Sequence, residues 1–280
     1  MRKNKSKNFF IKGTGKETRA FIHIDDFIRA FEIIMKNVGV IGFGRFGKIL
    51  ANILQKGFSI SAYDIKDTIS SSNVNFCSLD KVLDEGVIFI AVPIRNFEPL
   101  IKDISPKLKK GTTLIDVCSV KSFPVNVMLK YLSKDIGIIA THPMFGPDSF
   151  TTNTKLKMMM SNVRDPYNLF IPWRDYFSNQ DIDIIEMSPD EHDRLAARSQ
   201  GVTHFLGRML KQFGIKKTQI DTQGFKDLLD LVEQTCNDTW DLYTDLQLFN
   251  PYTLDTISEL RKSTETLDKQ LRKIKDVEKR

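Results

Sequence analysis

A Gly-x-Gly-x-x-Gly turn at residues 42–47 constrains the fold of this chain more than any other feature. An apolar run, 38–41, precedes the turn, and a helix-like segment, 48–56, follows it. In that context the glycines predict a dinucleotide-binding turn, because they permit a sharp bend, a close approach to a pyrophosphate and tight packing of helix on strand. The N–H groups at the helix start would face the anion. We therefore expect cofactor contacts from Gly42, Phe43, Gly44, Arg45, Phe46 and Gly47.

An acidic residue, Asp64, follows the next apolar run, 59–63. It lies about 20 residues past the glycines, where a carboxylate receives the ribose hydroxyls of a dinucleotide. A carboxylate there repels the extra phosphate of NADP, so the sequence favours NAD. Lys66, two residues later, leaves NADP open as a second cofactor. The alternative for Asp64 is an ordinary turn aspartate.

The length and composition of the chain exclude several classes of protein. Its 280 residues are enough for a real core and for two domains. No apolar run reaches the roughly 18 residues of a membrane span, so we expect no membrane association. The three widely spaced cysteines (Cys77, Cys118 and Cys236) and the four histidines show no metal-ligand spacing. We therefore expect no metal and a cytoplasmic location.

The net charge of +6 first suggests a nucleic-acid partner. The whole excess of positive charge lies within residues 1–20, and the remaining chain is formally neutral. A solvated basic tail explains this distribution, and no nucleic-acid motif appears elsewhere. We therefore expect no nucleic-acid binding.

The N-terminal segment resembles a different kind of protein from the rest of the chain. Residues 13–31 resemble a short piece of the nucleotide-sugar epimerase and dehydratase family, in which that piece belongs to the substrate-binding half. So short a piece cannot form that family's site, and it precedes the first strand of a complete dinucleotide fold. We interpret residues 1–36 as a basic leader or remnant. The alternative is a genuine helix at 25–35, packed on the outside of the sheet.

Short apolar runs alternate with helical stretches after Asp64, which predicts an α/β fold of the Rossmann type with a doubly wound parallel sheet. Buried strands are expected at 87–92, 112–117 and 136–140, with helices at 96–103 and 122–132. Two further strands, at 155–163 and 181–187, are candidates for antiparallel pairing and flank a helix near 167–178. Residues 37–187 are thus expected to form the dinucleotide-binding domain.

The pattern changes at Ser188, where Ser-Pro-Asp-Glu is typical of a helix start. Beyond it the strand signals vanish, and helical stretches cover 188–213, a broken 222–249, and 253–276. Residues 188–280 are therefore expected to form an all-α C-terminal domain that binds substrate. Its apolar residues need more cover than one small domain gives, so we expect a homodimer.

Three predicted strands are followed by residues that could do chemistry. In an open α/β sheet, ligands bind beyond the carboxyl ends of the strands. Val92 and Pro93 would form a turn beside the nicotinamide riboside, and Ser119 follows the next strand along the chain. His142 follows the strand after that and could take the proton of an alcohol while a hydride leaves the same carbon. By position alone, His142 is either that base or a structural histidine.

Together these residues resemble a known family. The blocks that carry the resemblance are Gly42–Gly47, Ser119–Lys121, His-Pro-Met-Phe-Gly-Pro at 142–147, Glu191-His192-Asp193, Ser199-Gln200 and Thr203-His204. They resemble the prephenate and arogenate dehydrogenases of tyrosine biosynthesis, most closely the arogenate type, over roughly residues 37–250. The resemblance implies an NAD(P)-dependent oxidoreductase whose small-molecule substrate is a cyclohexadiene. That substrate loses a hydride and carbon dioxide and becomes aromatic. Dimers are also implied.

The resemblance also implies roles for individual residues. His142 would assist deprotonation of the ring hydroxyl, and Ser119 would contact both that hydroxyl and His142. The residues expected to bind substrate are Asp148, His204, Lys121 and Gln200. Ser119 could alternatively only cap the following helix, and Asp148 could be a turn residue. His192 and Asp193 are interpreted as residues that orient the packing between domains.

One position departs from the family pattern. Many bacterial members carry an arginine for the substrate carboxylate shortly after a Gly-Phe-Lys-Asp sequence, here residues 224–227, and the matching place holds Asp230. An acid there fits the ammonium group of arogenate better than a keto acid, which is our hypothesis for Asp230.

Two other functions stay open at this point. A β-hydroxyacid dehydrogenase has a similar plan but uses a lysine on the first interdomain helix, and residues 194–208 contain none. A dinucleotide-binding protein that has lost catalysis is the second alternative.

Overall fold

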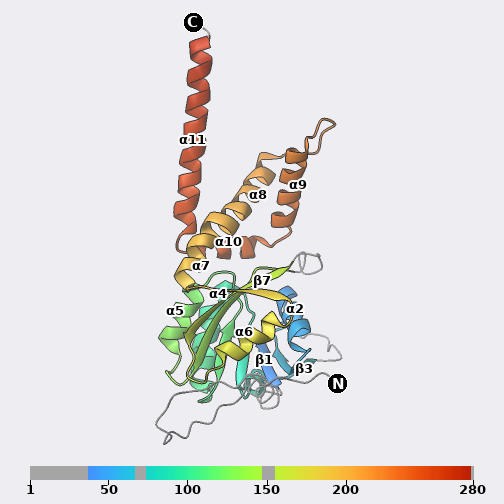
Figure 1. Cartoon of the computed structure of the whole chain (residues 1–280), viewed down its shortest axis with the longest axis vertical. Helices are drawn as coiled ribbons and strands as arrows, with labels where there is room; N and C mark the ends of the chain where they lie inside the picture. The colour runs from blue at the N-terminus through green and yellow to red at the C-terminus, as the bar shows by residue number, and fades with distance from the viewer. Residues whose placement is uncertain (1–36, 67–73, 147–154, 279–280) are drawn as a thin grey trace, which may run out of the picture.

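The computed structural model describes residues 37–66, 74–146 and 155–278 (Figure 1). The leader proposed for residues 1–36 therefore lies outside the described residues, as does Asp148. The strands are β1 (Asn37–Ile41), β2 (Ser59–Tyr63), β3 (Val74–Phe76), β4 (Val87–Ile90), β5 (Thr113–Asp116), β6 (Gly137–Pro143), β7 (Leu156–Arg164) and β8 (Ile182–Glu186).

The strands form one sheet in the order β3-β2-β1-β4-β5-β6-β7-β8. From β3 to β6 all neighbours pair in parallel, β7 is antiparallel to β6, and β8 is parallel to β7. The order reverses between β1 and β4, and such a reversal creates a ligand crevice at the carboxyl ends of the strands. The predicted Rossmann-type fold is confirmed, and the last two strands do run against the others.

Helices cover both faces of the sheet. They are α2 (Arg45–Leu54) and α6 (Phe170–Ser178) on one face, and α3 (Leu79–Val82), α4 (Ile94–Ile104) and α5 (Ser122–Tyr131) on the other. Successive side chains of β4 point to opposite faces of the sheet and belong to both helix layers. Phe89 packs with Trp173 of α6, whereas Ile88 and Ile90 pack with Phe97 of α4. Side chains that alternate between two buried faces explain why the central strands are continuous apolar runs.

The part of the chain after Ser188 is helical, as predicted. It consists of α7 (Pro189–Ala196), a π-helical turn (Ala197–Gly201), α8 (Val202–Phe213), α9 (Gln223–Cys236), α10 (Trp240–Phe249) and α11 (Thr253–Glu278). Ser188 starts α7 as expected, because its side chain accepts a hydrogen bond from the backbone N–H of Glu191. Figure 1 shows α8 and α9 side by side above the sheet and α11 extending far beyond both.

The helices join the sheet domain through α7 and α10. Arg95 at the start of α4 pairs with Asp241 and Asp245 of α10 at 2.7 and 2.8 Å. The rings of Phe123 on α5 and Phe249 on α10 lie 4.5 Å apart. No helix in the described part of the chain has both the length and the apolar character that a bilayer crossing requires.

Candidate active site

Two positions in the glycine turn have room for glycine alone. Gly42 has φ of +96°, and a Cβ there would lie 2.4 Å from the carbonyl oxygen of Ala91. A Cβ on Gly47 would lie 2.3 Å from the carbonyl oxygen of Gly42. These two glycines let α2 and the turn after β4 approach the end of β1 closely.

The middle of the turn faces open space. A Cβ on Gly44 would meet nothing within 4 Å among the described residues. The N-cap of α2 is Gly44, which has no side chain to cap the helix, and the first turn of α2 holds no acidic residue. An open backbone at this helix N-terminus fits the pyrophosphate of a dinucleotide, since the helix dipole favours an anion there.

Asp64 ties the end of β2 to the glycine turn. Its Oδ2 accepts a hydrogen bond from the backbone N–H of Phe43 at 2.6 Å, and its Oδ1 accepts one from Lys66 at 2.8 Å. Each carboxylate oxygen can accept a second bond, so Asp64 keeps capacity for ribose hydroxyls. Asp64 is therefore a turn residue that also fits the expected cofactor contact.

The turn after β4 lies beside the glycine turn. The backbone N–H of Ala91 donates to the carbonyl of Ile41 at the end of β1, which joins this turn to the glycine turn. Val92 is half-buried, and Pro93 is exposed at the N-cap of α4. Both lie at the edge where the sequence places the nicotinamide side of the cofactor.

His142 lies at the carboxyl end of β6, and only 4% of its surface is exposed. Burial is the main cause that holds the pKa of its ring well below 6.5, and electrostatic interactions with His192 and Lys121 add to the shift. The ring is therefore neutral at neutral pH. A neutral ring at this edge of the sheet can accept a proton.

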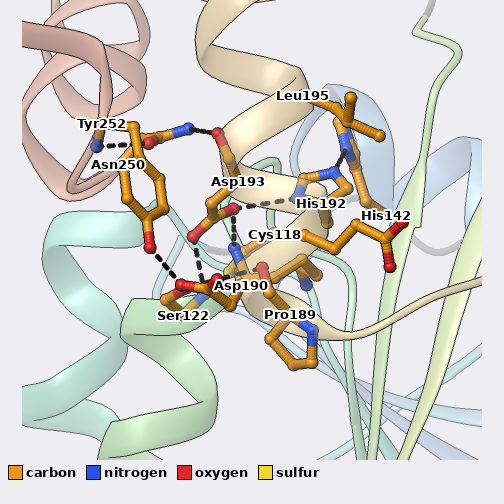
Figure 2. Close-up of polar contacts among 12 residues, drawn as sticks. Cys118, Ser122, His142, Pro189, Asp190, His192, Asp193, Leu195, Asn250 and Tyr252 are labelled. Carbon is orange, nitrogen blue, oxygen red and sulfur yellow. Dashed lines mark hydrogen bonds and ion pairs between the residues drawn. The ribbon is translucent and has the colours of Figure 1, made fainter. Parts of the chain in front are cut away.

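A second histidine from α7 contacts His142. The Nδ1 of His142 lies 2.8 Å from the Nε2 of His192, and the Nδ1 of His192 lies 2.9 Å from the Oδ1 of Asp193. Figure 2 shows these three side chains as one hydrogen-bonded line from β6 to α7. His192 and Asp193 lie on α7, and His192 also contacts the candidate base, His142, while Asp193 contacts His192.

Asp193 is held by the start of α5. Its two carboxylate oxygens accept hydrogen bonds from the backbone N–H groups of Lys121 and Ser122, both at 2.8 Å. Burial raises the pKa of Asp193, but these bonds and the contact with His192 outweigh it, so that the pKa lies below its ordinary value. Asp193 is therefore ionised.

Lys121, which was expected to bind substrate, has a buried side chain that points into the protein. Its side chain has no exposed surface and forms an ion pair with Asp116, at the end of β5. Its ammonium also donates to the carbonyl of Thr141. Burial raises the pKa of Asp116, and the ammonium of Lys121 opposes that rise. The structure gives Lys121 a role in joining β5 to β6 and no surface for a substrate.

Ser119 lies half-buried in the loop between β5 and α5. It does not cap α5: the N-cap is Lys121, and the carboxylate of Asp193 accepts from the first N–H groups of the helix. The reading of Ser119 as a helix cap was wrong. Ser119 follows β5, and His142 lies at the carboxyl end of β6, the neighbouring parallel strand, so both residues lie at the same edge of the sheet.

The remaining predicted substrate residues lie on the helical part. Gln200 is half-buried in the π-helical turn, and His204 on α8 lies 3.9 Å from the carboxylate of Asp238. At 1.5 Å per residue, His204 is about 18 Å along the helix from His192. Asp230 is exposed on α9, beside this outer part of α8. His204 and Asp230 thus lie on the part of the helices that is further along the chain from His192.

No group of three or more metal-ligating side chains occurs in the described residues. The contact of His192 with His142, and of Asp193 with His192, was not predicted from the sequence. The available signal was the Glu-His-Asp block directly after the Ser188 helix start.

The chain is similar to known proteins in both halves. Residues 51–159 match the family model "Prephenate dehydrogenase, nucleotide-binding domain", and residues 209–280 match "TYRAAT1-like, C-terminal domain". Arogenate dehydrogenase 1, chloroplastic, of Arabidopsis thaliana is 36% identical over 84% of this chain and 39% of its own length. Arogenate dehydrogenase 2, chloroplastic, of the same plant is 33% identical over 84% of this chain and 69% of its own length. The chain thus spans only part of these relatives.

Solved structures share the fold. The prephenate dehydrogenase of A. aeolicus, in complex with hydroxyphenyl propionate and NAD+, has a TM-score of 0.67 at 22% identity and covers 85% of this chain and 91% of its own. The arogenate dehydrogenase of Synechocystis has a TM-score of 0.63 at 19% identity and covers 85% and 92%.

Proposed function

The chain belongs to the prephenate and arogenate dehydrogenase family, and we propose that it catalyses oxidative decarboxylation of arogenate, or of prephenate, with hydride transfer to a nicotinamide cofactor in tyrosine biosynthesis. The observation that carries the proposal is His142. It is a neutral, buried imidazole at the sheet edge that also holds the glycine turn. That pairing of a proton acceptor with a dinucleotide crevice is what oxidation of an alcohol requires.

In the proposed reaction, His142 accepts the proton of the ring hydroxyl as a hydride leaves the same carbon. The bound nicotinamide supplies the hydride acceptor. The bond to the ring carboxylate breaks, carbon dioxide departs, and the electron pair of that bond completes the aromatic ring. The proton then returns to the phenolic oxygen, so His142 ends unchanged. Aromatisation supplies the driving force, and the protein positions the reacting groups.

Ser119 is proposed to orient the ring hydroxyl toward His142. Its place in the loop after β5, next to β6, supports this role. The turn residues Gly42–Gly47, Asp64, Val92 and Pro93 are proposed to hold the cofactor. The two bonds that Asp64 accepts leave lone pairs for ribose hydroxyls, and a carboxylate at this place would repel the extra phosphate of NADP, which supports NAD over NADP.

The substrate is proposed to be arogenate, on the basis of Asp230. Its exposed carboxylate could pair with the ammonium group that arogenate has and prephenate lacks. Asp230 directly precedes Leu231, whose backbone carbonyl lies near Gly207 of α8, and Gly207 is about 22 Å along the helix from His192 in the same copy. We therefore propose that Asp230, like His204, reaches a substrate only from a second copy of the chain.

A homodimer would bring Asp230 and His204 of one copy closer to the substrate of the other copy, and it would cover apolar surface. Large exposed apolar side chains on or between α8 and α11 are Met209, Phe213, Ile220, Leu228, Trp240, Leu242, Leu248, Leu254, Leu267, Leu271 and Ile274. So much exposed apolar surface is typical of an interface. The helical domain from residue 188 is proposed as the dimerisation domain, and sedimentation at twice the 32.2 kDa chain mass is the expected result.

For the compartment we propose the cytoplasm, because all three cysteines are free. A plastid is the alternative, because the names of both plant relatives include "chloroplastic".

An assay that crosses NAD and NADP with arogenate and prephenate tests the proposed function. We expect the highest kcat/KM with NAD and arogenate. A clear preference for prephenate would refute the role of Asp230, and no turnover with any of the four pairs would refute the activity itself. A β-hydroxyacid dehydrogenase or an inactive binding protein would give that last result.

A further inference from the structure

We propose that His192 is a positioning residue that fixes His142 in the tautomer with a protonated Nδ1, so that the lone pair of Nε2 faces the substrate. The proposal deepens the proposed function and rests on it for the role of His142 as base. Three observations support it: the donors and acceptors along the line from Asp193 to His142, the burial of both rings, and the anchoring of α7 on the sheet domain.

The hydrogen-bond pattern allows one arrangement when both rings are neutral. Asp193 is ionised and can only accept, so the Nδ1 of His192 must donate to it. The Nε2 of a neutral His192 is then an acceptor. At 2.8 Å from that nitrogen, the Nδ1 of His142 must donate. The Nε2 of His142 is left with its lone pair, which is the state a general base needs.

The geometry leaves only the Nε2 of His142 for a bond to substrate. Its Nδ1 is occupied by His192, and the two rings meet edge to face with an interplanar angle of 81°. Both rings have only 4% of their surface exposed, so water does not compete for the shared bond. Without such a partner, neutral imidazole is free to place its proton on either nitrogen.

The residue that holds the ring of His192, Asp193, is itself held on several sides. Its carboxylate accepts hydrogen bonds from the backbone N–H groups of Lys121 and Ser122, and its backbone carbonyl accepts one from the side-chain amide of Asn250 at 2.9 Å. Figure 2 shows this web joining the start of α5, α7 and the segment after α10. The relay is therefore complete only when α7 is docked on the sheet domain.

The charges around His142 make the positioning necessary. Among the described residues, the ammonium of Lys121 acts on the ring of His142 and forms an ion pair with Asp116, whose carboxylate interacts with His192. The nearby ammonium disfavours a positive ring. A proton taken up at Nε2 is best tolerated when the Nδ1–H points along the line that ends at the carboxylate of Asp193.

Two variants of His192 separate this role from simple packing. His192→Phe keeps a ring but removes the acceptor, whereas His192→Gln supplies an amide oxygen that can accept from Nδ1 of His142. The matched control is Arg194→Gln, on the same helix as His192. It loses an ion pair with Asp190 and the stacking on Tyr252, which precedes α11, and does not touch His142.

The first readout is the tautomer of His142 in the full chain without substrate, from nitrogen-15 NMR of the imidazoles. We expect protonated Nδ1 in the unchanged protein, in His192→Gln and in Arg194→Gln, and a mixture or the Nε2–H form in His192→Phe. The same Nδ1–H form in His192→Phe would overturn the proposal. This measurement needs no turnover, so it tests the tautomer of His142 independently of the proposed activity.

The second readout is turnover with arogenate and NAD. We expect kcat of His192→Phe to fall by ~10²-fold or more, with KM for NAD unchanged, because a base in the wrong tautomer cannot take the proton. His192→Gln should recover most of that loss, and Arg194→Gln should stay within ~3-fold of the unchanged protein. Equal losses in His192→Phe and Arg194→Gln would show a packing role and overturn the proposal.

Discussion

Phe46 at the start of α2 lies beside Phe145 in the loop after β6, with ring centroids 6.1 Å apart. Phe46 belongs to the glycine turn, and Phe145 follows His142 by three residues. Segments far apart in sequence thus meet at one edge of the sheet. This contact places the dinucleotide turn beside the loop that follows the candidate base.

Two glycines of the turn should respond differently to alanine. Gly42→Ala should lower both the melting temperature and NAD affinity, because it needs a positive φ and its Cβ would strike the carbonyl of Ala91. Gly44→Ala should leave the melting temperature unchanged, because its Cβ meets no described atom, while weakening NAD binding by ~10-fold or more through contact with the pyrophosphate. Thermal unfolding and NAD titration measure the two effects. Unchanged NAD affinity in Gly44→Ala would contradict the predicted cofactor position.

Gly207 permits the close approach of α8 and α9. A Cβ there would lie 1.9 Å from the Oγ1 of Thr235, so Gly207→Ala should destabilise the helical domain by ~1–3 kcal/mol. Thr235→Ala removes that oxygen, and the double variant should recover part of the loss. Urea unfolding of the two single variants and the double variant gives the coupling. Strict additivity would mean that the two residues do not touch.

The ion pairs of Arg95 should stabilise the contact between α4 and α10. Arg95→Ala leaves the carboxylate of Asp245, whose side chain is only 5% exposed, without its cation. We expect a lower urea midpoint than in the control Asp241→Asn, which changes a carboxylate that is 71% exposed. Equal midpoints for the two variants would contradict the greater importance of Asp245.

Stability should fall as the pH drops below about 6.5, with His142 as one cause. In the unfolded chain this histidine takes up a proton near pH 6.5, whereas the folded protein holds its pKa well below that value. The unfolded state then binds more protons, so the free energy of unfolding decreases as pH falls through that window. His142→Asn should reduce this pH dependence in urea titrations between pH 5 and 7. An identical slope would contradict the buried, neutral state.

The sequence predicts most of the sheet because buried strands are continuous apolar runs. The bounds predicted for β2 match the structure, and β4 and β5 each lie within the predicted run. The short β3 and α3 were not predicted, since three or four residues carry no periodic signal. The break at Ala197–Gly201 was also missed, because a π-helical turn has no distinct pattern.

The candidate site was predicted in part. His142 was identified because a strand end and flanking prolines and glycine are visible locally in sequence. The roles of His192 and Lys121 depend on contacts across the fold. His192 meets a residue 50 positions away, and Lys121 is turned inward by Asp116 and Thr141. The Glu-His-Asp block shows that His192 stands near a helix start but not which residue it meets, so Lys121 was assigned to the substrate and His192 to packing.

The central claim is that His142 is the base of an oxidative decarboxylation. Its most direct test compares the full chain with His142→Asn for turnover of arogenate with NAD, alongside NAD affinity. We predict that the full chain forms tyrosine, carbon dioxide and NADH in equal amounts. In His142→Asn, kcat should fall by at least ~10²-fold while NAD affinity is unchanged. Undiminished turnover in His142→Asn would contradict the claim.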